Sequence, residues 1–461
     1  MYSYAANASA ASTPQEGQRW SLIEWFMLVE FAASVALVLP GGQGARFLIR
    51  SLPYVGNVGL LFVYCQRSPS WKLFPGTHWL ILVSVLLATE MLNPKTALIP
   101  GLAQVVFCNA IDASAFWGGK GIRDKRRLDR ILYLMFLFAA AGAVVGFLQA
   151  KFGVLMPAQF SSVALASDPR KVEELTYIGA NGHAIIRPPG LSDMPAGACG
   201  SAMYAVVLGI ALALGSRSLR WSSLLYLAIV LVATVTLYLT QVRIMFVSAV
   251  VGVALISWAA ARQRRRYGLR IAVAAAAVLT AAFIYAVAIG GASVSDRFAS
   301  LVAEDPGKTY QANRGHFITH TIDDLLPTYP LGAGLGRWGM MRTYTENYIN
   351  VSDPPAIWAE IQMTGWLLDG GFLMWILYGG AILSSLAYSY RTASKHSDPE
   401  LRYLAGIVLT LNAVTVLMAW DAPVFNSGLG GEFWKLSSAL AGIREFSRKD
   451  VRLRQPSNQV A

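Results

Sequence analysis

Charged residues are scarce in this sequence, and their scarcity excludes a soluble protein. Only 14% of the 461 residues are charged, 55% are hydrophobic, and the mean hydropathy is +0.46. A soluble globule of this size needs more polar surface than that. Apolar stretches recur from near residue 22 to near residue 445, and one helical span takes about 20 apolar residues. The sequence therefore predicts an all-α protein, a polytopic transmembrane helical bundle. Barrel strands would instead alternate apolar and polar residues.

Cysteine and leader signals are also lacking. The 3 cysteines, Cys65, Cys108 and Cys199, lie within or beside apolar segments and show no CxxC or other metal-ligand spacing. We interpret them as buried thiols and expect neither a metal site nor a cofactor. Residues 1–18 are small and polar, without the basic start and cleavage site of a signal peptide. Residues 1–20 are therefore expected to form a disordered cytoplasmic tail.

Basic residues outnumber acidic ones, 38 to 26, and they cluster in short connections between apolar segments. This is the positive-inside pattern of a membrane protein, so the net charge of +12 does not indicate a nucleic-acid partner. Placing the basic connections on one side of the bilayer gives a membrane domain at 21–445 and a basic tail at 446–461, with both termini cytoplasmic. The twelve expected segments are centred near 22–40, 47–65, 78–92, 97–117, 131–150, 196–214, 221–239, 244–261, 271–290, 357–389, 403–420 and 430–445.

Two long external loops remain, at 151–195 and 291–356, and loops of this length are usually functional or disordered. A polar block at 310–371 overlaps the second loop. It contains a turn with glycines, which permit a close approach of the backbone to another group. Arginines, which are permanently charged, precede and follow this turn. We interpret the block as an anion site. Its residues of interest are Gly332, Gly334, Gly336, Arg314, Arg337 and Arg342.

Two further arginines are expected on the same side. Arg187 precedes a Pro-Pro-Gly turn in the first loop, and Arg243 lies at the external mouth of segment 244–261 between apolar residues. An arginine so placed needs a partner.

Four stretches in this order resemble the O-antigen ligase and polymerase family of bacterial membrane glycosyltransferases. They are RPPGLSDMPAG at 187–197, LTQVR at 239–243, NRGHFITHTIDDLLPTYPLGAGLGRWG at 313–339 and AEIQMTGWLLDGG at 359–371. The resemblance covers roughly residues 180 to 375. Where the family usually has a histidine at the start of the helix after the glycine turn, this chain has Glu360. That difference favours a polymerase of exopolysaccharide, capsule or O-antigen repeat units over a ligase.

The resemblance implies a GT-C-like fold in the bacterial cytoplasmic membrane and an oligosaccharide donor linked to polyprenyl pyrophosphate. Membrane lipids and other polysaccharide assembly proteins are the further partners that it implies. Arg187, Arg243 and Arg314 would hold the leaving pyrophosphate, because guanidinium groups match phosphate oxygens and act best where charge develops. Glu360 would be the general base for the acceptor hydroxyl, with Asp369 as the second choice.

The same loop offers weaker candidates for substrate binding. His316 and His320 have the i, i+4 spacing of one helix face. They either hold acceptor sugar or pyrophosphate or have a structural role, and a metal site is not expected because no HExxH motif is present. Gly334, Gly336 and Arg337 complete the expected substrate-binding set. Aromatic residues around the block either stack on sugars or form an interfacial belt: Trp338, Tyr344, Tyr348, Trp358 and Trp366.

Each candidate also has a structural interpretation. Arg187 would cap the following helix, Arg243 would extend to the interface, and Arg314 would pair with Asp323 or Asp324. Glu360 would be a helix-start acid and Asp369 the partner of a structural arginine.

Two other functions stay open: an O-antigen ligase, or a secondary transporter or lipid-linked glycan flippase. Acidic residues inside segments favour a transporter, but they are scattered and lack evident basic partners: Glu24, Glu30, Glu90 and Asp112.

Overall fold

The computed structural model is almost entirely helical. It describes residues 20–39, 45–67, 74–152, 176–192, 197–215, 221–262, 265–303, 305–339, 342, 359 and 361–454. Eight helices within these residues are long and apolar enough to cross a membrane. The first half contains α1 (Leu22–Val38), α2 (Arg46–Arg67), α3 (Pro75–Glu90), α4 (Leu98–Gly121), α5 (Lys125–Phe152), the hairpin strands β1 (Thr176–Ile178) and β2 (Ala184–Ile186), and α8 (Ala198–Gly215).

The second half has the same character, except for a row of short helices. It contains α9 (Trp221–Thr240), α10 (Arg243–Ala261), α11 (Arg265–Gly290), α12 (Ala292–Ala303), α13 (Pro306–Tyr310), η2 (Gln311–Gly315), α14 (His316–His320), η3 (Thr321–Leu325), α15 (Leu326–Thr328), α17 (Gln362–Lys395), α18 (Pro399–Met418), η5 (Val424–Asn426) and α19 (Gly428–Arg454). Each of the twelve segments expected from the sequence overlaps one of these helices, and eight of the described helices have the length and hydropathy of a membrane span.

Local sequence signals fix several helix ends. Ser21 caps α1, accepting a hydrogen bond from Ile23 N at 3.3 Å, while Glu24 accepts from Ser21 N at 2.7 Å and so completes a capping box. Asp398 caps α18 by accepting hydrogen bonds from the amides of Glu400 and Leu401, and Pro399 occupies the first helical position. These caps satisfy amide groups that would otherwise lack partners at the helix starts.

Small residues let the central helices approach closely. A Cβ placed on Gly442 of α19 would lie 2.1 Å from the carbonyl oxygen of Gly119 in α4, and one on Gly118 would lie 2.2 Å from Ser438 Oγ. Contacts of this kind are typical of helix pairs in membranes, where packing rather than the hydrophobic effect drives association.

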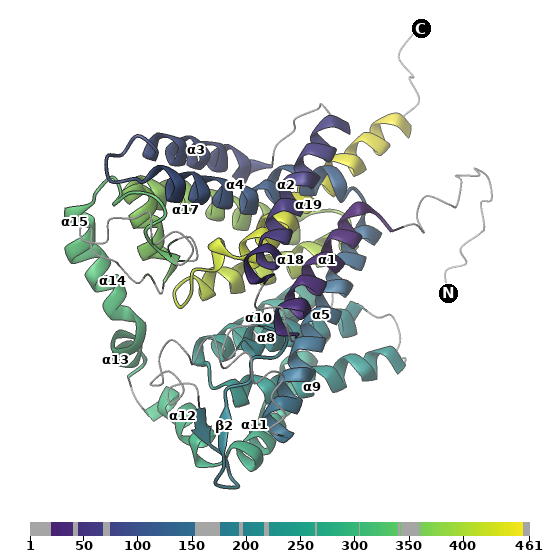
Figure 1. The fold of residues 1–461 in the computed structure, drawn as a ribbon. Helices are drawn as coiled ribbons and strands as arrows, with labels where there is room; N and C mark the ends of the chain where they lie inside the picture. Colours follow the sequence, from purple (N-terminus) through teal and green to yellow (C-terminus); the bar gives the residue numbers. More distant parts are fainter. Residues whose placement is uncertain are drawn as a thin grey trace.

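The connections between helices gather on two opposite faces. The segment α12–α15 runs along one edge of the molecule, whereas the start of α1 and the end of α19 lie on the other side (Figure 1). We call the side of α12–α15 the loop face. On the far side, Lys125 at the start of α5 pairs with Asp398, at 2.9 Å, and with Glu400. The connections expected to be cytoplasmic therefore meet one another.

The segment expected at 357–389 is not one straight helix. Gly370 and Gly371 have non-helical backbone angles, and the φ of Gly371 is 61°. The chain reverses there, because the rings of Trp366 and Tyr378 lie 4.7 Å apart, whereas an unbroken helix would separate these residues by about 18 Å. The short first half of α17 thus folds back on the second half.

Candidate functional site

Arg314 of η2 is held on the loop face by an acidic residue from a distant connection. Its Nε lies 3.3 Å from Oδ1 of Asp421, which follows α18. Nearby, Tyr310 donates a hydrogen bond from its hydroxyl to the carbonyl of Trp420 at 3.0 Å. The sequence had suggested Asp323 or Asp324 as the partner of Arg314. Asp324 instead lies 2.8 Å from Nδ1 of His320.

Burial affects the charge of this ion pair. It raises the pKa of the Asp421 carboxyl above its usual value, and the positive charge of Arg314 opposes that rise. Asp421 stays ionised more readily while Arg314 is beside it. Protonation of Asp421 therefore releases Arg314 to bind another anion.

Arg243 is the first residue of α10 and has a partner on α12. Its Nη2 donates to Ser300 Oγ at 2.6 Å, which confirms that the arginine needs a partner. The turn before it contains Gln241, whose φ of 57° lies in the left-handed region; a non-glycine residue there is strained. Gln241 donates from its side chain to Ser293 Oγ at 3.1 Å. Two bonds to α12 therefore fix this turn.

Arg187 directly follows β2 and lies beside the buried Tyr177 of β1. Burial raises the pKa of the Tyr177 hydroxyl, and the charge of Arg187 opposes that rise. The next residue, Pro188, accepts a hydrogen bond from the amide of Ala198, the first residue of α8, at 3.3 Å. Arg187 thus lies against the start of α8.

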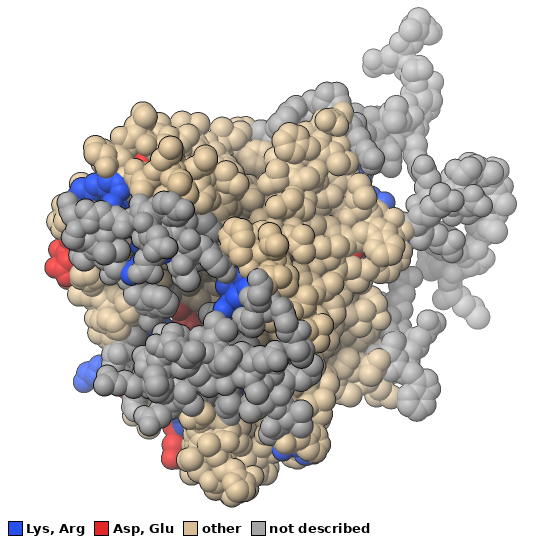
Figure 2. Space-filling model, viewed as in Figure 1, with Lys and Arg blue, Asp and Glu red and all other residues tan. Residues whose placement is uncertain are grey.

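The three arginines surround one region of the loop face. Asp421, the partner of Arg314, follows α18, whose Thr415 shares a hydrogen bond of 2.8 Å with Tyr204 of α8. Tyr177, which lies beside Arg187, belongs to the same apolar cluster as Phe298 of α12. The same helix, α12, accepts a hydrogen bond from Arg243 through Ser300. In Figure 2, basic and acidic side chains are both visible near the middle of this face of the molecule. Because α8 packs on α9, α10 and α18, the three arginines lie on connections around the loop-face end of α8.

The glycine turn approaches another segment of the chain. Gly334 and Gly336 have φ of 100° and 76°. A Cβ on Gly334 would lie 2.8 Å from the backbone of Lys95, in the connection between α3 and α4, and one on Gly336 would lie 2.7 Å from the backbone of Pro100, in the first turn of α4. Arg337 is buried and donates from Nε to the carbonyl of Lys95 at 3.1 Å. The close approach expected from the glycines is thus made to protein backbone. Their role in holding a substrate stays a prediction.

Asp369 is buried at the break in α17. Its Oδ2 accepts a hydrogen bond from Nε2 of Gln104 in α4 at 2.7 Å, and its side chain is 1% exposed. Trp338 interacts with the same carboxylate, although neither its Nε1 nor Asp369 Oδ1 makes a hydrogen bond of standard geometry within the described residues. Glu360 lies outside the described residues. Both catalytic assignments stay predictions.

The two histidines of the block lie at the surface, and its two described tryptophans are buried. His316 and His320 both lie on α14 and are exposed. No group of three or more metal-binding side chains occurs in the part of the chain that the structure describes. Trp338 and Trp366 are buried, whereas Tyr344, Tyr348 and Trp358 lie outside the described residues.

The sequence predicts that the acidic residues inside the segments lack basic partners. This prediction is wrong for two of them. Glu24 lies 3.7 Å from Nη1 of Arg130, and Glu30 lies 3.4 Å from Nζ of Lys435. Lys435 is 2% exposed and was not a candidate from the sequence. A lysine in the middle of an expected segment, three residues after a glutamate, is the signal that could have identified it.

Comparison of the chain with protein-family models and with curated proteins gives no match. The resemblance of the four stretches therefore stands on the residues themselves.

Proposed function

We propose that this protein joins polyprenyl-pyrophosphate-linked oligosaccharide repeat units into an exopolysaccharide, capsule or O-antigen, at the external face of the bacterial cytoplasmic membrane. In this proposal the loop face is external, twelve helices cross the membrane in a GT-C-like arrangement, and both termini are cytoplasmic. The clustering of Lys and Arg in the short connections of the opposite face supports this orientation.

The observation that carries the proposal is the arrangement of Arg187, Arg243 and Arg314 around one end of α8. Arg314 already binds the carboxylate of Asp421, and a phosphate presents the same kind of planar pair of acceptors to a guanidinium. Three permanent cations on one face can stabilise a leaving pyrophosphate, whose charge grows as the glycosidic bond breaks.

The acceptor hydroxyl must lose its proton as it attacks the donor sugar. Glu360 is our first choice for the base, and Asp369 is the second. Asp369 is shielded from water and bonded to Gln104, so it needs a movement of the α17 break to reach a substrate. This geometry supports the preference for Glu360.

Two alternatives compete with this proposal. A ligase would use the same donor and the same arginines, and it differs only in its acceptor. A lipid-linked glycan flippase or a transporter is favoured by the charges of Glu30 and Lys435 between the helices, because transport sites lie near the middle of the bilayer.

The purified protein in vesicles, supplied with lipid-linked repeat units and no energy source, tests the proposal. Polymer and free polyprenyl pyrophosphate should both form. Arg243→Lys and Arg314→Lys should lose much of this activity, since a point charge cannot replace the planar fork, and the alanine variants should lose more. Movement of intact repeat units across the bilayer without polymer would support the flippase, and full activity of both alanine variants would contradict the arginine site.

A further inference from the structure

A cavity of about 510 Å³ lies between α1, α2, α5, α8 and the start of α19. Ser192 and Ser427, which line it, belong to connections on the loop face, whereas Glu30 lies in the middle of α1. The cavity thus extends from the loop face toward the centre of the bundle. Its volume falls in the range of about 300–1,000 Å³ that is common for ligand pockets.

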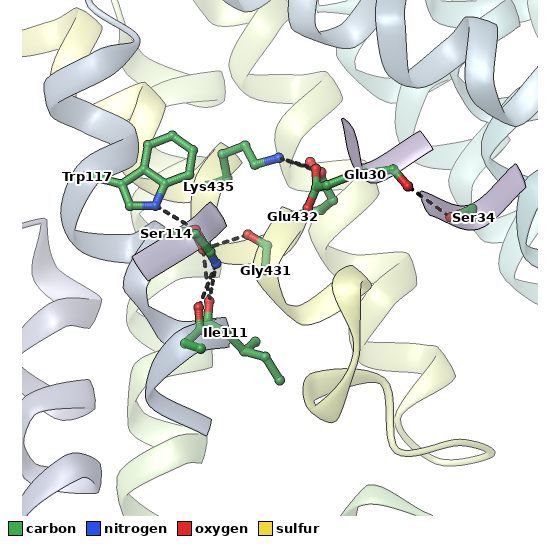
Figure 3. A network of polar contacts seen from close by, with 10 residues as sticks. Glu30, Ser34, Ile111, Ser114, Trp117, Gly431, Glu432 and Lys435 are labelled. Carbon is green, nitrogen blue, oxygen red and sulfur yellow. Dashed lines mark hydrogen bonds and ion pairs between the residues drawn. The ribbon is translucent and has the colours of Figure 1, made fainter. Parts of the chain in front are cut away.

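Three charged side chains meet at the inner end of this cavity. Lys435 reaches from α19 to Glu432, at 2.6 Å, and to Glu30 on α1, at 3.4 Å (Figure 3). Figure 3 also shows a separate set of neutral bonds joining α4 to α19, such as that from Ser114 Oγ to the carbonyl of Gly431 at 2.8 Å. These neutral bonds fasten α19 to α4, whereas the ions link α19 to α1. Charges are costly between membrane helices, and those that occur there commonly mark functional sites.

The carboxylates in the cavity wall are paired with a cation behind it. Glu30, Glu432 and Arg50 line the cavity, and Lys435 lies 3.4 Å from Glu30 and 2.6 Å from Glu432. Oε2 of Glu432 is buried and accepts no hydrogen bond from the described residues. Because an ionised carboxylate only accepts, the occupant must offer hydrogen-bond donors.

The walls add a second requirement. The rings of Phe31 and Phe138 stack with centroids 4.3 Å apart, and both line the cavity, together with the hydroxyl groups of Ser34 and Ser201. An occupant must therefore present hydroxyl groups toward the carboxylates and C–H surface toward the rings. Sugars combine these two properties.

We propose that this cavity is a carbohydrate-binding site, with the Glu432 carboxylate as an acceptor for sugar hydroxyls and the Phe31–Phe138 pair as its apolar wall. The site itself follows from the lining residues. Its assignment to the acceptor glycan rests on the proposed function. If the charged group served only to fasten α1 to α19, its loss would lower stability without changing any binding.

Saturation-transfer NMR on the full-length protein in nanodiscs tests the site. The probes are six neutral sugars: glucose, galactose, mannose, rhamnose, N-acetylglucosamine and N-acetylgalactosamine. At least one should receive saturation from the wild-type protein. Glu432→Gln should weaken its binding about tenfold or more, because a hydrogen bond to a charged acceptor is lost. Ser34→Phe, which fills an exposed position of the cavity wall, should abolish binding without altering the charged group.

Thr280→Phe is the matched control, since Thr280 is exposed on α11 and, like Ser34, donates to the carbonyl four residues earlier. Binding should survive in this variant. Absence of binding by all six sugars, or binding unchanged in Ser34→Phe, would overturn the proposal. Because the readout is binding, failure here leaves the arginine site and its turnover assay untouched, and loss of turnover in the arginine variants leaves this binding intact.

Discussion

Arg314 Nε lies 3.3 Å from Asp421 Oδ1, and this ion pair joins two connections that are far apart in the sequence. Both side chains are partly exposed, so an arriving anion can compete with Asp421 for the guanidinium. Asp421 therefore controls how readily Arg314 binds an anion, although Asp421 lies outside the four stretches that resemble the glycosyltransferase family.

Replacing the competitor should strengthen anion binding. In Asp421→Asn the carboxylate no longer occupies Arg314, and we expect pyrophosphate to bind the purified protein about two to five times more tightly, the worth of a partly exposed ion pair. Isothermal titration measures the change. Asp305→Asn is the control, because Asp305 is an exposed acid on the same face that caps α13. Equal tightening in both variants would mean that only the net charge matters.

The same pair predicts a dependence on pH. Burial raises the pKa of Asp421, against the opposing charge of Arg314, so the carboxylate takes up a proton at a higher pH than an exposed aspartate would. As the pH falls through that pKa, Arg314 is released and anion binding should strengthen. Sulfate is the suitable probe, since its charge stays constant over this range. The informative quantity is the part of the slope that Asp421→Asn removes.

Gly371 and Gly379 provide a matched test of the break in α17. A Cβ on Gly371 would lie 2.1 Å from the carbonyl oxygen of Pro330, at a φ of 61°, whereas a Cβ on Gly379 meets nothing within 4 Å. Gly371→Ala should therefore destabilise the protein by at least about 1–3 kcal/mol, and Gly379→Ala should stabilise it by up to about 1 kcal/mol. Thermal unfolding in detergent measures both. Similar stability of the two variants would contradict the reversal at Gly371.

The helices could be located from the sequence because an apolar run of about 20 residues satisfies all of its backbone hydrogen bonds in a bilayer only as a helix. It did not find the reversal at Gly370–Gly371, since a glycine pair in an apolar run does not distinguish a break from close packing. The caps at Ser21 and Asp398 are local and can be read from a few neighbouring residues.

The partners of charged residues were harder to predict, because they come from other helices. Asp421 lies in a short connection with no motif, and Lys435 lies within an apolar segment, so nothing local connects either to Arg314 or Glu30. The arginines of the candidate site could be predicted, whereas the partners that hold them required the fold.

Cysteine labelling tests the orientation of the two faces. Asp305 and Asp124 are both exposed and both accept a hydrogen bond from a nearby backbone amide, on opposite faces. In a Cys65→Ser background, Asp305→Cys should react with a membrane-impermeant thiol reagent in intact cells, and Asp124→Cys should react only after lysis. Position 165, which lies outside the described residues, should behave like 305, and position 265 like 124. Labelling of Asp124→Cys in intact cells would reverse the proposed orientation.

The sharpest prediction concerns the general base. Glu360→Gln keeps the shape of the side chain but cannot accept a proton, so polymer formation should fall by about 10²–10⁴-fold while the lipid-linked donor still binds and accumulates. A helix-start acid would instead change stability by only about 0.3–1 kcal/mol and leave polymer nearly unchanged.

Asp369→Asn is the companion variant. Its amide oxygen can still accept the bond from Gln104, so folding should survive and any loss of polymer reports on chemistry. Polymer and lipid-linked repeat units measured in strains carrying each variant distinguish the two carboxylates, and wild-type polymer from both would leave the carboxylate mechanism without support.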